Sequence, residues 1–263
     1  MSDRKLTSLT ELIVSLRALP PLRTAVVYPC DKLSLSGLAE VAAARIIKPT
    51  AIGPVARIRE LASSLGIDLS GIDVFHAADG RAAAERAVEL VQNGQVDALM
   101  KGSLETDELM AAVVHKDSGI RTARRISHVF VIDLPAYSKL LLITDAAVNI
   151  VPTLEDKVDI LQNAIELAHA LQDGGPRPDY RSPVAGDPDI LLVPDMESGN
   201  ILVKEERLFA AAEAAGIVLG ARVPVILTSR ADNVPARIAS CAVAALYTHT
   251  RRESAMGIGQ FEG

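Results

Sequence analysis

The chain contains few aromatic residues and few cysteines, and both shortages limit what kind of protein it can be. Aromatic side chains make up 3% of its 263 residues and tryptophan is absent, so the core must be built from aliphatic side chains. Aliphatic cores are typical of parallel strands covered by helices. The two cysteines, Cys30 and Cys241, are too few for a disulfide framework and form no C-x-x-C pair. We therefore expect reduced thiols and a cytoplasmic protein.

Three further absences exclude whole classes of function. The formal net charge of −6 disfavours nucleic-acid binding, which usually requires a basic face. No apolar run approaches the ~18 residues of a membrane span, and residues 1–12 lack the apolar stretch of a signal peptide. The five histidines show neither H-x-x-x-H nor H-E-x-x-H spacing, so we expect no metal site.

Short strand-like segments alternate with helical patterns, which is typical of βαβ units. The segment 81–92 shows the helical pattern, because Ala84, Ala87, Val88 and Val91 recur at the spacing of one buried face. The expected strands are residues 24–28, 50–53, 73–75, 98–101, 128–133, 140–144, 189–193, 216–219 and 224–228. The expected helices are residues 34–47, 54–65, 81–92, 107–114, 154–171, 202–215 and 234–248. This order predicts a compact, doubly wound α/β protein.

One segment interrupts the alternation. Residues 172–188 contain four prolines and three glycines in seventeen positions, which excludes a helix or a central strand. A loop of this length in a compact domain is typically functional, disordered or the trace of a lost element.

Four expected strands end in polar or glycine-containing turns that lead into helices. The turns are Lys101-Gly102-Ser103, Thr144-Asp145, residues 194–200 and residues 228–232. In open α/β sheets, ligands bind at the carboxyl ends of strands, where helix amino ends offer unpaired N–H groups. These turns would suit an anionic substrate such as a phosphate. The alternative for each turn taken alone is ordinary helix capping.

Common catalytic fingerprints are missing. The Lys101-Gly102-Ser103 turn lacks the upstream glycine of a P-loop, because position 96 is Val. No G-x-G-x-x-G follows an expected strand and no G-x-S-x-G occurs, which disfavours nucleotide hydrolysis, nicotinamide chemistry and a nucleophile elbow. Arg121, Arg124 and Arg125 cluster before an expected strand, where they are either solvated charges or an anion clamp.

Three sequence blocks carry a family resemblance. The first is KGSLETDELMAAVV with the following GIRTARRISHVFVID, the second is LLITDAAVNIVPTLEDKVDILQNAIELA, and the third is SPVAGDPDILLVPDMESGNILVK with GIVLGARVPVILTSRADNVPARIASCAVA. In this order they resemble the phosphate acetyl/butyryltransferase family. Their amino-acid sequences are most similar to the phosphate butyryltransferase branch and to the acetyltransferase part of enoyl-CoA hydratase fusions.

The resemblance implies a reaction and an architecture. The reaction interconverts acyl-CoA plus phosphate with acyl phosphate plus CoA, and it needs no metal or other cofactor. The implied fold is three-layer α/β/α, like the isocitrate and isopropylmalate dehydrogenases, with two domains facing each other across the active site. We expect residues 1–146 plus 230–263 to form the first domain and 147–229 the second. The resemblance also implies a homodimer or higher homo-oligomer.

The resemblance assigns roles to individual residues. Ser229 and Arg230 match the family's Ser-Arg pair: Arg230 would stabilise charge on the phosphate or carbonyl, and Ser229 would donate a hydrogen bond to the tetrahedral intermediate. The acetyltransferase branch carries an Asp seven residues after this serine, where the present chain has Ala236. Asp232 is either the base that deprotonates the CoA thiol or a helix cap. The expected substrate-binding residues are Lys101, Gly102, Ser103, Gly199, Asn200 and Thr228.

The segment 172–188 departs from the family pattern. Relatives carry a further strand, a helix and a D-G-P-L-A-F-D-N-A-like segment there, so we expect a shortened second domain. The alternative function is therefore a catalytically impaired homologue that binds CoA or acyl phosphate, or acts as an oligomeric scaffold. A metal- and NAD-dependent decarboxylating dehydrogenase on the same fold is a third alternative, disfavoured by the missing cofactor fingerprint and the lack of a clustered Asp set. The acyl-chain preference stays open.

Overall fold

The computed structural model describes residues 6–118, 120–172, 188–227 and 232–258. Thr228, Ser229 and Arg230, three of the expected site residues, therefore lie outside the described part of the chain. Most of the segment 172–188 lies outside it as well.

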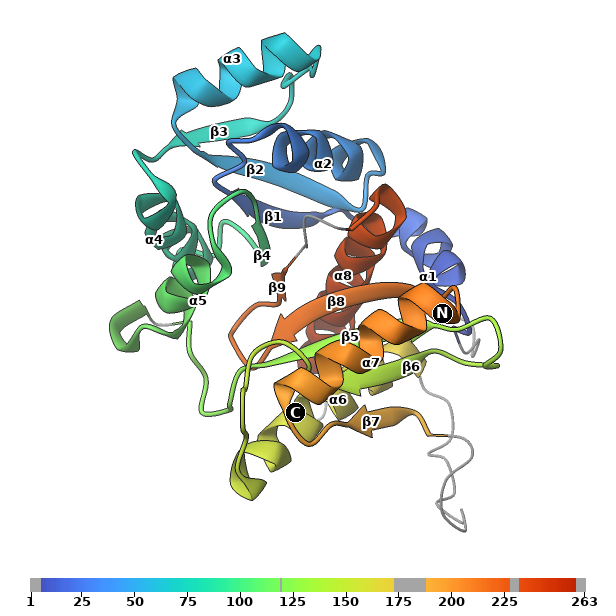
Figure 1. Cartoon of the computed structure of the whole chain (residues 1–263). Coiled ribbons are helices and arrows are strands. Elements are labelled where there is room, and N and C mark those ends of the chain that lie inside the picture. The colour runs from blue at the N-terminus through green and yellow to red at the C-terminus, as the bar shows by residue number, and fades with distance from the viewer. Residues whose placement is uncertain (1–5, 119, 173–187, 228–231, 259–263) are drawn as a thin grey trace.

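The described residues form a mixed α/β structure with one large sheet (Figure 1). Its strands are β1 (Leu22–Val27), β2 (Ile47–Gly53), β3 (Asp73–His76), β4 (Ala98–Lys101), β5 (Ser127–Asp133), β6 (Leu141–Thr144), β7 (Ile190–Leu192), β8 (Glu213–Leu219) and β9 (Val225–Ile226). The helices are α1 (Leu9–Ser15), α2 (Lys32–Ala43), α3 (Val55–Leu65), α4 (Gly80–Gln92), α5 (Thr106–Val114), α6 (Leu154–Gln172), α7 (Met196–Phe209) and α8 (Val234–Ile258), with short 3-10 turns η1 (Leu16–Ala18) and η2 (Lys116–Ser118).

The strand directions divide the sheet into two halves. The strand order is β3-β2-β1-β4-β9-β8-β5-β6-β7. From β3 to β9 all neighbouring strands are parallel, whereas β8 runs antiparallel to both β9 and β5, and β5 antiparallel to β6. The carboxyl ends of β6, β7 and β8 consequently lie at the opposite edge of the sheet from those of β1, β4 and β9. Lys101-Gly102-Ser103 and Asp232 therefore lie at one edge of the sheet, whereas Thr144-Asp145 and the start of α7 lie at the other.

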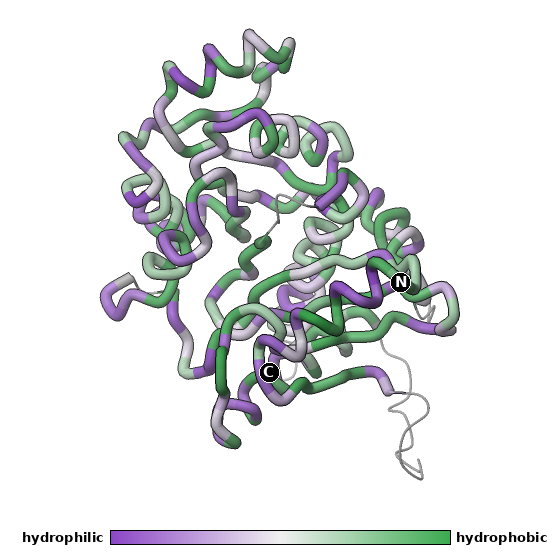
Figure 2. Tube along the Cα trace, in the orientation of Figure 1, coloured by the Kyte–Doolittle hydropathy of each residue, from purple (hydrophilic) through white to green (hydrophobic). Residues whose placement is uncertain are grey.

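Apolar side chains fill both faces of the sheet. One cluster joins α1, α2, α6 and α8 to strands of both halves, from Leu22 to Val131 and Ile217. A second cluster holds α4 and α5 on the other face, and a third packs α7 against β5, β6 and β8. Figure 2 shows hydrophobic residues running along the strands and hydrophilic ones on the outer turns of the helices. The result is three layers, as the family resemblance implies.

Helix α8 lies at the centre of the larger cluster. Its residues from Cys241 to Tyr247 are all buried and four of them are alanine or valine. Small side chains let a helix approach a sheet closely, and α8 packs against β8, α1, α2 and α6. The start of α8 at Val234 directly follows Asp232 and Asn233, so these two residues are attached to a buried helix.

Each of the nine expected strands is present, whereas several helices differ from expectation. Helix α2 ends at Ala43 and not at residue 47, because Ile47 begins β2, and α8 continues to Ile258, ten residues past its expected end. The helix expected at 202–215 starts six residues earlier, because the Asp195 side chain accepts a hydrogen bond from the Ser198 N–H and caps α7 at Met196. The end of that expected helix, residues 213–215, belongs instead to β8, which pairs with β5. Helix α1 was not predicted; it is only seven residues long and is held by burial of Leu9 and Leu12.

The sheet is continuous across the shortened region. Helix α6 ends at Gln172, and β7 begins at Ile190 and pairs directly with β6, with Leu142 opposite Ile190. β5 and β6, assigned by sequence to the first domain, lie beside β8 and β7. The division of the chain into two domains stays a prediction. Among the described residues, no helix is long and apolar enough to cross a membrane.

Candidate functional site

The turns after β1 and β4 interlock at one edge of the sheet. The Gly102 N–H donates to the Val27 carbonyl at 2.8 Å and the Ser103 N–H to the Tyr28 carbonyl at 2.9 Å. The Ser103 hydroxyl also donates to the Tyr28 carbonyl at 2.7 Å and accepts from the Cys30 N–H at 3.2 Å. A Cβ on Gly102 would lie 2.7 Å from the Tyr28 backbone and closer still to the Val27 oxygen. Only glycine fits here.

This interlock determines how the first three expected binding residues can act. The Ser103 hydroxyl is engaged with backbone groups of the β1–α2 turn, so its contribution in this structure is to hold that turn. The Lys101 ammonium donates to the Leu104 carbonyl at 2.9 Å.

Tyr28 has a φ of 57°, a left-handed conformation that is strained for a bulky residue. Strain of this kind at a strand end is typical of functional sites.

Asp232 lies on the same edge, directly before α8. Its carboxylate pairs with the Arg207 guanidinium of α7, with Nη1 3.1 Å from Oδ1. The helix cap comes from the next residue, since the Asn233 side-chain oxygen accepts from the Ala236 N–H at 2.9 Å. The sequence left two roles for Asp232, a base or a helix cap. Because Asn233 supplies the cap, Asp232 is not needed for it. Ala236, where the acetyltransferase branch has an Asp, is buried in the first turn of α8.

A buried arginine, missed by sequence reasoning, touches the backbone of Asp232. Arg237 of α8 is only 6% exposed. Its Nη1 donates to the Asp232 carbonyl at 2.6 Å and its Nη2 to Glu40 of α2 at 2.7 Å. The signal available in the sequence was a charged residue four positions before Cys241, on the face of α8 that is otherwise apolar.

Gly199 and Asn200 lie within the first turns of α7 and not in a loop, which corrects the expectation from sequence. A Cβ on Gly199 would lie 2.7 Å from Ala146 Cβ and from Val193 Cγ2. Glycine is needed here because α7 packs tightly against the segments that follow β6 and β7. These residues lie at the sheet edge opposite Asp232 and Ser103.

The Thr144-Asp145 turn is occupied by its own carboxylate. Asp145 accepts hydrogen bonds from the backbone N–H groups of His128, Ala147, Val148 and Asn149 and from the Asn149 amide. Burial raises the pKa of the Asp145 carboxyl, and these donors oppose that change. Since the carboxylate already fills the N–H groups of the turn, we infer a structural role for it.

Two of the three clustered arginines make ion pairs. Arg124 pairs with Glu166 at 2.5 Å, and Arg125 pairs with Asp156 at 3.3 Å and donates to the Asn149 side chain at 2.7 Å. These contacts tie the segment before β5 to α6. They favour solvated and paired charge over an anion clamp for Arg124 and Arg125.

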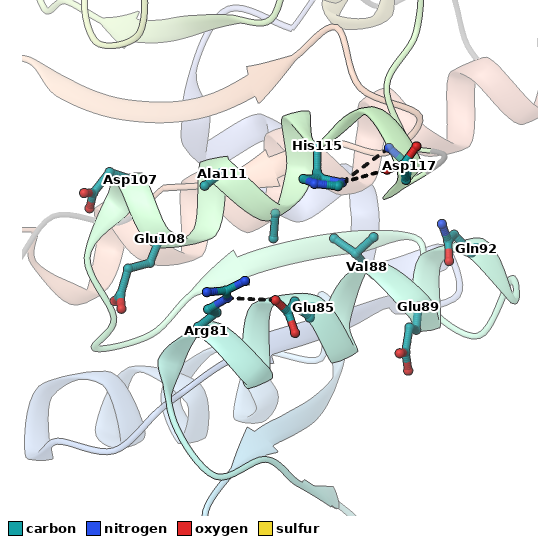
Figure 3. A pocket seen from close by; sticks show the side chains of 11 residues that line it. Arg81, Glu85, Val88, Glu89, Gln92, Asp107, Glu108, Ala111, His115 and Asp117 are labelled. Carbon is teal, nitrogen blue, oxygen red and sulfur yellow. Dashed lines mark hydrogen bonds and ion pairs between the residues drawn. The ribbon is translucent and has the colours of Figure 1, made fainter.

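Two hollows in the described structure differ in whether expected site residues lie beside them. One of about 630 Å³ lies between α4 and α5 (Figure 3), and its charged lining is mostly acidic: Arg81, Glu85, Glu89, Asp107, Glu108 and Asp117. None of the expected site residues lines it, and its carboxylates disfavour a phosphate. A smaller hollow of about 150 Å³ is lined by Arg207, Asn233 and Ala236, next to Asp232. The described residues contain no group of three or more His, Cys, Asp or Glu side chains suited to a metal ion.

Comparison with known proteins identifies the family. The family model described as "Phosphate acetyl/butaryl transferase" matches residues 80–178 and 179–245. The chain belongs to this family. It is 42% identical to a phosphate acetyltransferase of Rhizobium meliloti, over 92% of this chain and 93% of that protein. It is 30% identical to a phosphate butyryltransferase of Clostridium beijerinckii, over 90% and 96% of the two chains.

The same fold occurs in a phosphotransacetylase from Streptococcus pyogenes. That structure superposes with a TM-score of 0.76 at 17% identity, covering 93% of this chain and all of the other. Architecture is thus shared at low sequence similarity. Between the two curated relatives above, the acetyltransferase is the more similar one, although the sequence blocks resemble the butyryltransferase branch.

The comparisons also locate the shortened segment of this phosphate acyltransferase family member. The family match is divided between residues 178 and 179, within the proline-rich segment. The alignment with the Rhizobium protein spans 295 positions, more than the 263 residues of the chain. Such an alignment requires residues in the relative that have no counterpart here. Both observations agree with the predicted loss of a family segment near 172–188.

Proposed function

We propose that the protein is a phosphate acyltransferase that interconverts a short-chain acyl-CoA plus phosphate with acyl phosphate plus CoA, with acetyl as the first acyl group to test. The observation that carries this proposal is family membership over most of the chain, at 42% identity to an acetyltransferase. The geometry supports it: β4 pairs in parallel with both β1 and β9, so the carboxyl ends of these three strands are neighbours at one edge of the sheet.

The chemistry assigns a task to each group at this edge. In the direction of acyl-CoA formation, the CoA thiol loses its proton and the thiolate attacks the acyl phosphate carbonyl. A carbon–sulfur bond forms, the bond from the carbonyl carbon to the phosphate oxygen breaks, and phosphate leaves with the electron pair. We assign Arg230 to the charge on carbonyl and phosphate, Ser229 to a hydrogen bond on the tetrahedral intermediate, and Asp232 to the proton. The reverse direction uses phosphate as the nucleophile on the thioester.

The remaining residues hold this arrangement. Lys101 ends β4, the strand that pairs with β9, and we assign its ammonium to the anionic substrate. Gly102 and Ser103 hold the turns after β1 and β4 together. We assign Thr228, two residues after the end of β9 in the chain, to substrate contact. Asn200 and Gly199 lie at the opposite edge, so their predicted contact with substrate is the least supported of these assignments. We also propose a homo-oligomeric cytoplasmic protein that takes CoA and phosphate as substrates, not as bound cofactors.

A release assay tests the function. Acetyl-, propionyl- and butyryl-CoA are each incubated with the protein with and without phosphate, and free CoA thiol is measured. We expect phosphate-dependent release, fastest with one acyl chain, and an Arg230→Ala variant weakened by about 2–4 kcal/mol of transition-state stabilisation. A folded protein that binds CoA but releases none from any thioester would instead be the impaired homologue. Light scattering gives the oligomeric state on the same sample.

A further inference from the structure

We propose that Arg237 is a positioning residue for acyl transfer, because it ties the backbone of Asp232 to α2. This inference rests on the proposed function. The contacts form a continuous series: Glu40 of α2 pairs with Arg237 of α8, Arg237 donates to the Asp232 carbonyl, and the Asp232 carboxylate pairs with Arg207 of α7. Asp232 is thereby held from two sides, through its main chain and through its side chain.

The burial of Arg237 makes these contacts obligatory. Its side chain is 7% exposed, and a buried guanidinium is costly unless its N–H groups are paired. Nη1 and Nη2 have partners at 2.6 and 2.7 Å, whereas Nε has none among the described residues. The Arg237 side chain therefore has few alternative arrangements in which its charge remains compensated. Movement of the Asp232 carbonyl would leave Nη1 without its partner as well.

Gly37 supplies an independent observation. It lies inside α2, where glycine is destabilising relative to alanine, so its presence needs a reason. A Cβ at this position would lie 3.1 Å from Arg237 Nε and 3.2 Å from Arg237 Cδ. The surface of α2 is thus recessed where the guanidinium of Arg237 lies. The bare glycine, Glu40 one turn later and Arg237 together form a buried seat, which we call the Arg237 clamp.

Stability alone does not account for the Arg237 clamp. Helix α8 is already capped by Asn233 and anchored by an apolar face from Cys241 to Tyr247. Buried ion pairs commonly contribute little net stability compared with apolar residues of similar volume, and their attested use is to fix one arrangement. The arrangement fixed here is the backbone of Asp232, two residues after Arg230 in the chain. Displacements of about 1 Å at a reacting group can cost a hundredfold in rate.

The test compares kcat and KM of the full-length protein in the acetyl-CoA release assay for Arg237→Met, Arg237→Lys and Glu40→Gln. We expect Arg237→Met to lower kcat by about a hundredfold with KM changed less than about threefold, and Arg237→Lys to recover part of the loss. Glu40→Gln keeps an acceptor and should lose less. A further variant, Arg237→Ala, leaves room for a guanidinium ion, and added guanidinium should partly restore its kcat. Arg251→Ala, on an exposed turn of the same helix, is the matched control and should leave kcat unchanged.

The outcomes separate this inference from the proposed function. Absence of turnover in the unsubstituted protein would overturn both, whereas an active protein whose Arg237→Met variant keeps its kcat overturns the clamp alone. Should Arg237→Met fail to fold, Gly37→Ala decides, because it retains the guanidinium and only crowds it: unchanged kcat in a folded Gly37→Ala protein contradicts the inference. A fall in kcat that guanidinium does not relieve and that follows the loss of thermal stability across the variants also contradicts it.

Discussion

Replacing Gly102 by alanine should strongly destabilise the protein, because the turns after β1 and β4 meet at this residue. The added Cβ would meet the Tyr28 carbonyl carbon and oxygen at 2.7 Å and the Val27 oxygen closer still. All of these are backbone atoms, so relief requires the β1–α2 turn to move away from the β4–α5 turn. That movement breaks the hydrogen bonds from the Gly102 and Ser103 N–H groups to Val27 and Tyr28.

The magnitude follows from these losses. Overpacking in a closely packed region costs about 1–3 kcal/mol, and each of the two hydrogen bonds contributes about 1 kcal/mol. We therefore expect the free energy of unfolding to fall by about 3–5 kcal/mol. For a chain of this size, 1 kcal/mol corresponds to about 2–4 °C in Tm, so Tm should drop by roughly 6–20 °C. Turnover should fall as well, because Lys101 and Ser103 belong to the same turn.

The assay is thermal unfolding together with the CoA-release rate. The matched control is Gly66→Ala, since Gly66 has a left-handed φ of 66° but no heavy atom within 4 Å of an added Cβ. That variant should lose only the conformational cost of about 1–2 kcal/mol and keep its turnover. If Gly102→Ala unfolds at the same temperature as the unsubstituted protein and keeps its rate, the interlock of the two turns is not what holds this edge.

Two further predictions concern buried titratable groups. Burial lowers the pKa of His128 from 6.5 to about 3, so its contribution to stability is fully present above pH 6.5 and is lost as the pH falls towards 3. Urea unfolding should therefore show about 2 kcal/mol less stability at pH 5 than at pH 7. The His128→Asn variant should show a smaller difference between these two pH values. Burial raises the pKa of Cys241 to about 12 and raises that of Cys30, so neither thiol should react with a thiol reagent at pH 8 until urea is added. Rapid labelling of the native protein would contradict the burial of these two residues.

The elements themselves were largely predictable from sequence, because periodicity and turn chemistry are local. The strand at Ala98–Lys101 was placed with both ends correct: Asp97 precedes it, and Gly102 follows it in a turn. The start of α7 was misplaced because its Asp195 cap was interpreted as part of a polar loop. The alanines before β8 suit a helix by propensity, but pairing with β5 and burial of Ala214 and Ala215 determine their structure.

Strand direction was not predictable, and it decided which expected residues share an edge. Nothing in the alternation of apolar residues says that β5 runs antiparallel to β8 and β6. For that reason Asp145 and Gly199 were grouped with Ser103 and Asp232, from which the sheet separates them. Arg237 was missed for a related reason, since its importance depends on a contact with Glu40, 197 positions earlier in the chain.

The direction of β7 bears on how the shortened segment affects activity. This segment leads from α6 to the amino end of β7, and β7 runs antiparallel to β5 and β9. The amino end of β7 therefore lies at the edge where β1, β4 and β9 end. Four strand spacings of about 4.8 Å separate β7 from β9 along the sheet, about 19 Å in all. The contacts that join Asp232 to Arg207 and Arg237 are made by residues outside this segment. We therefore expect the loss of this segment to weaken substrate binding and to leave the reacting groups in place, which a raised KM for acyl-CoA with a retained kcat would show.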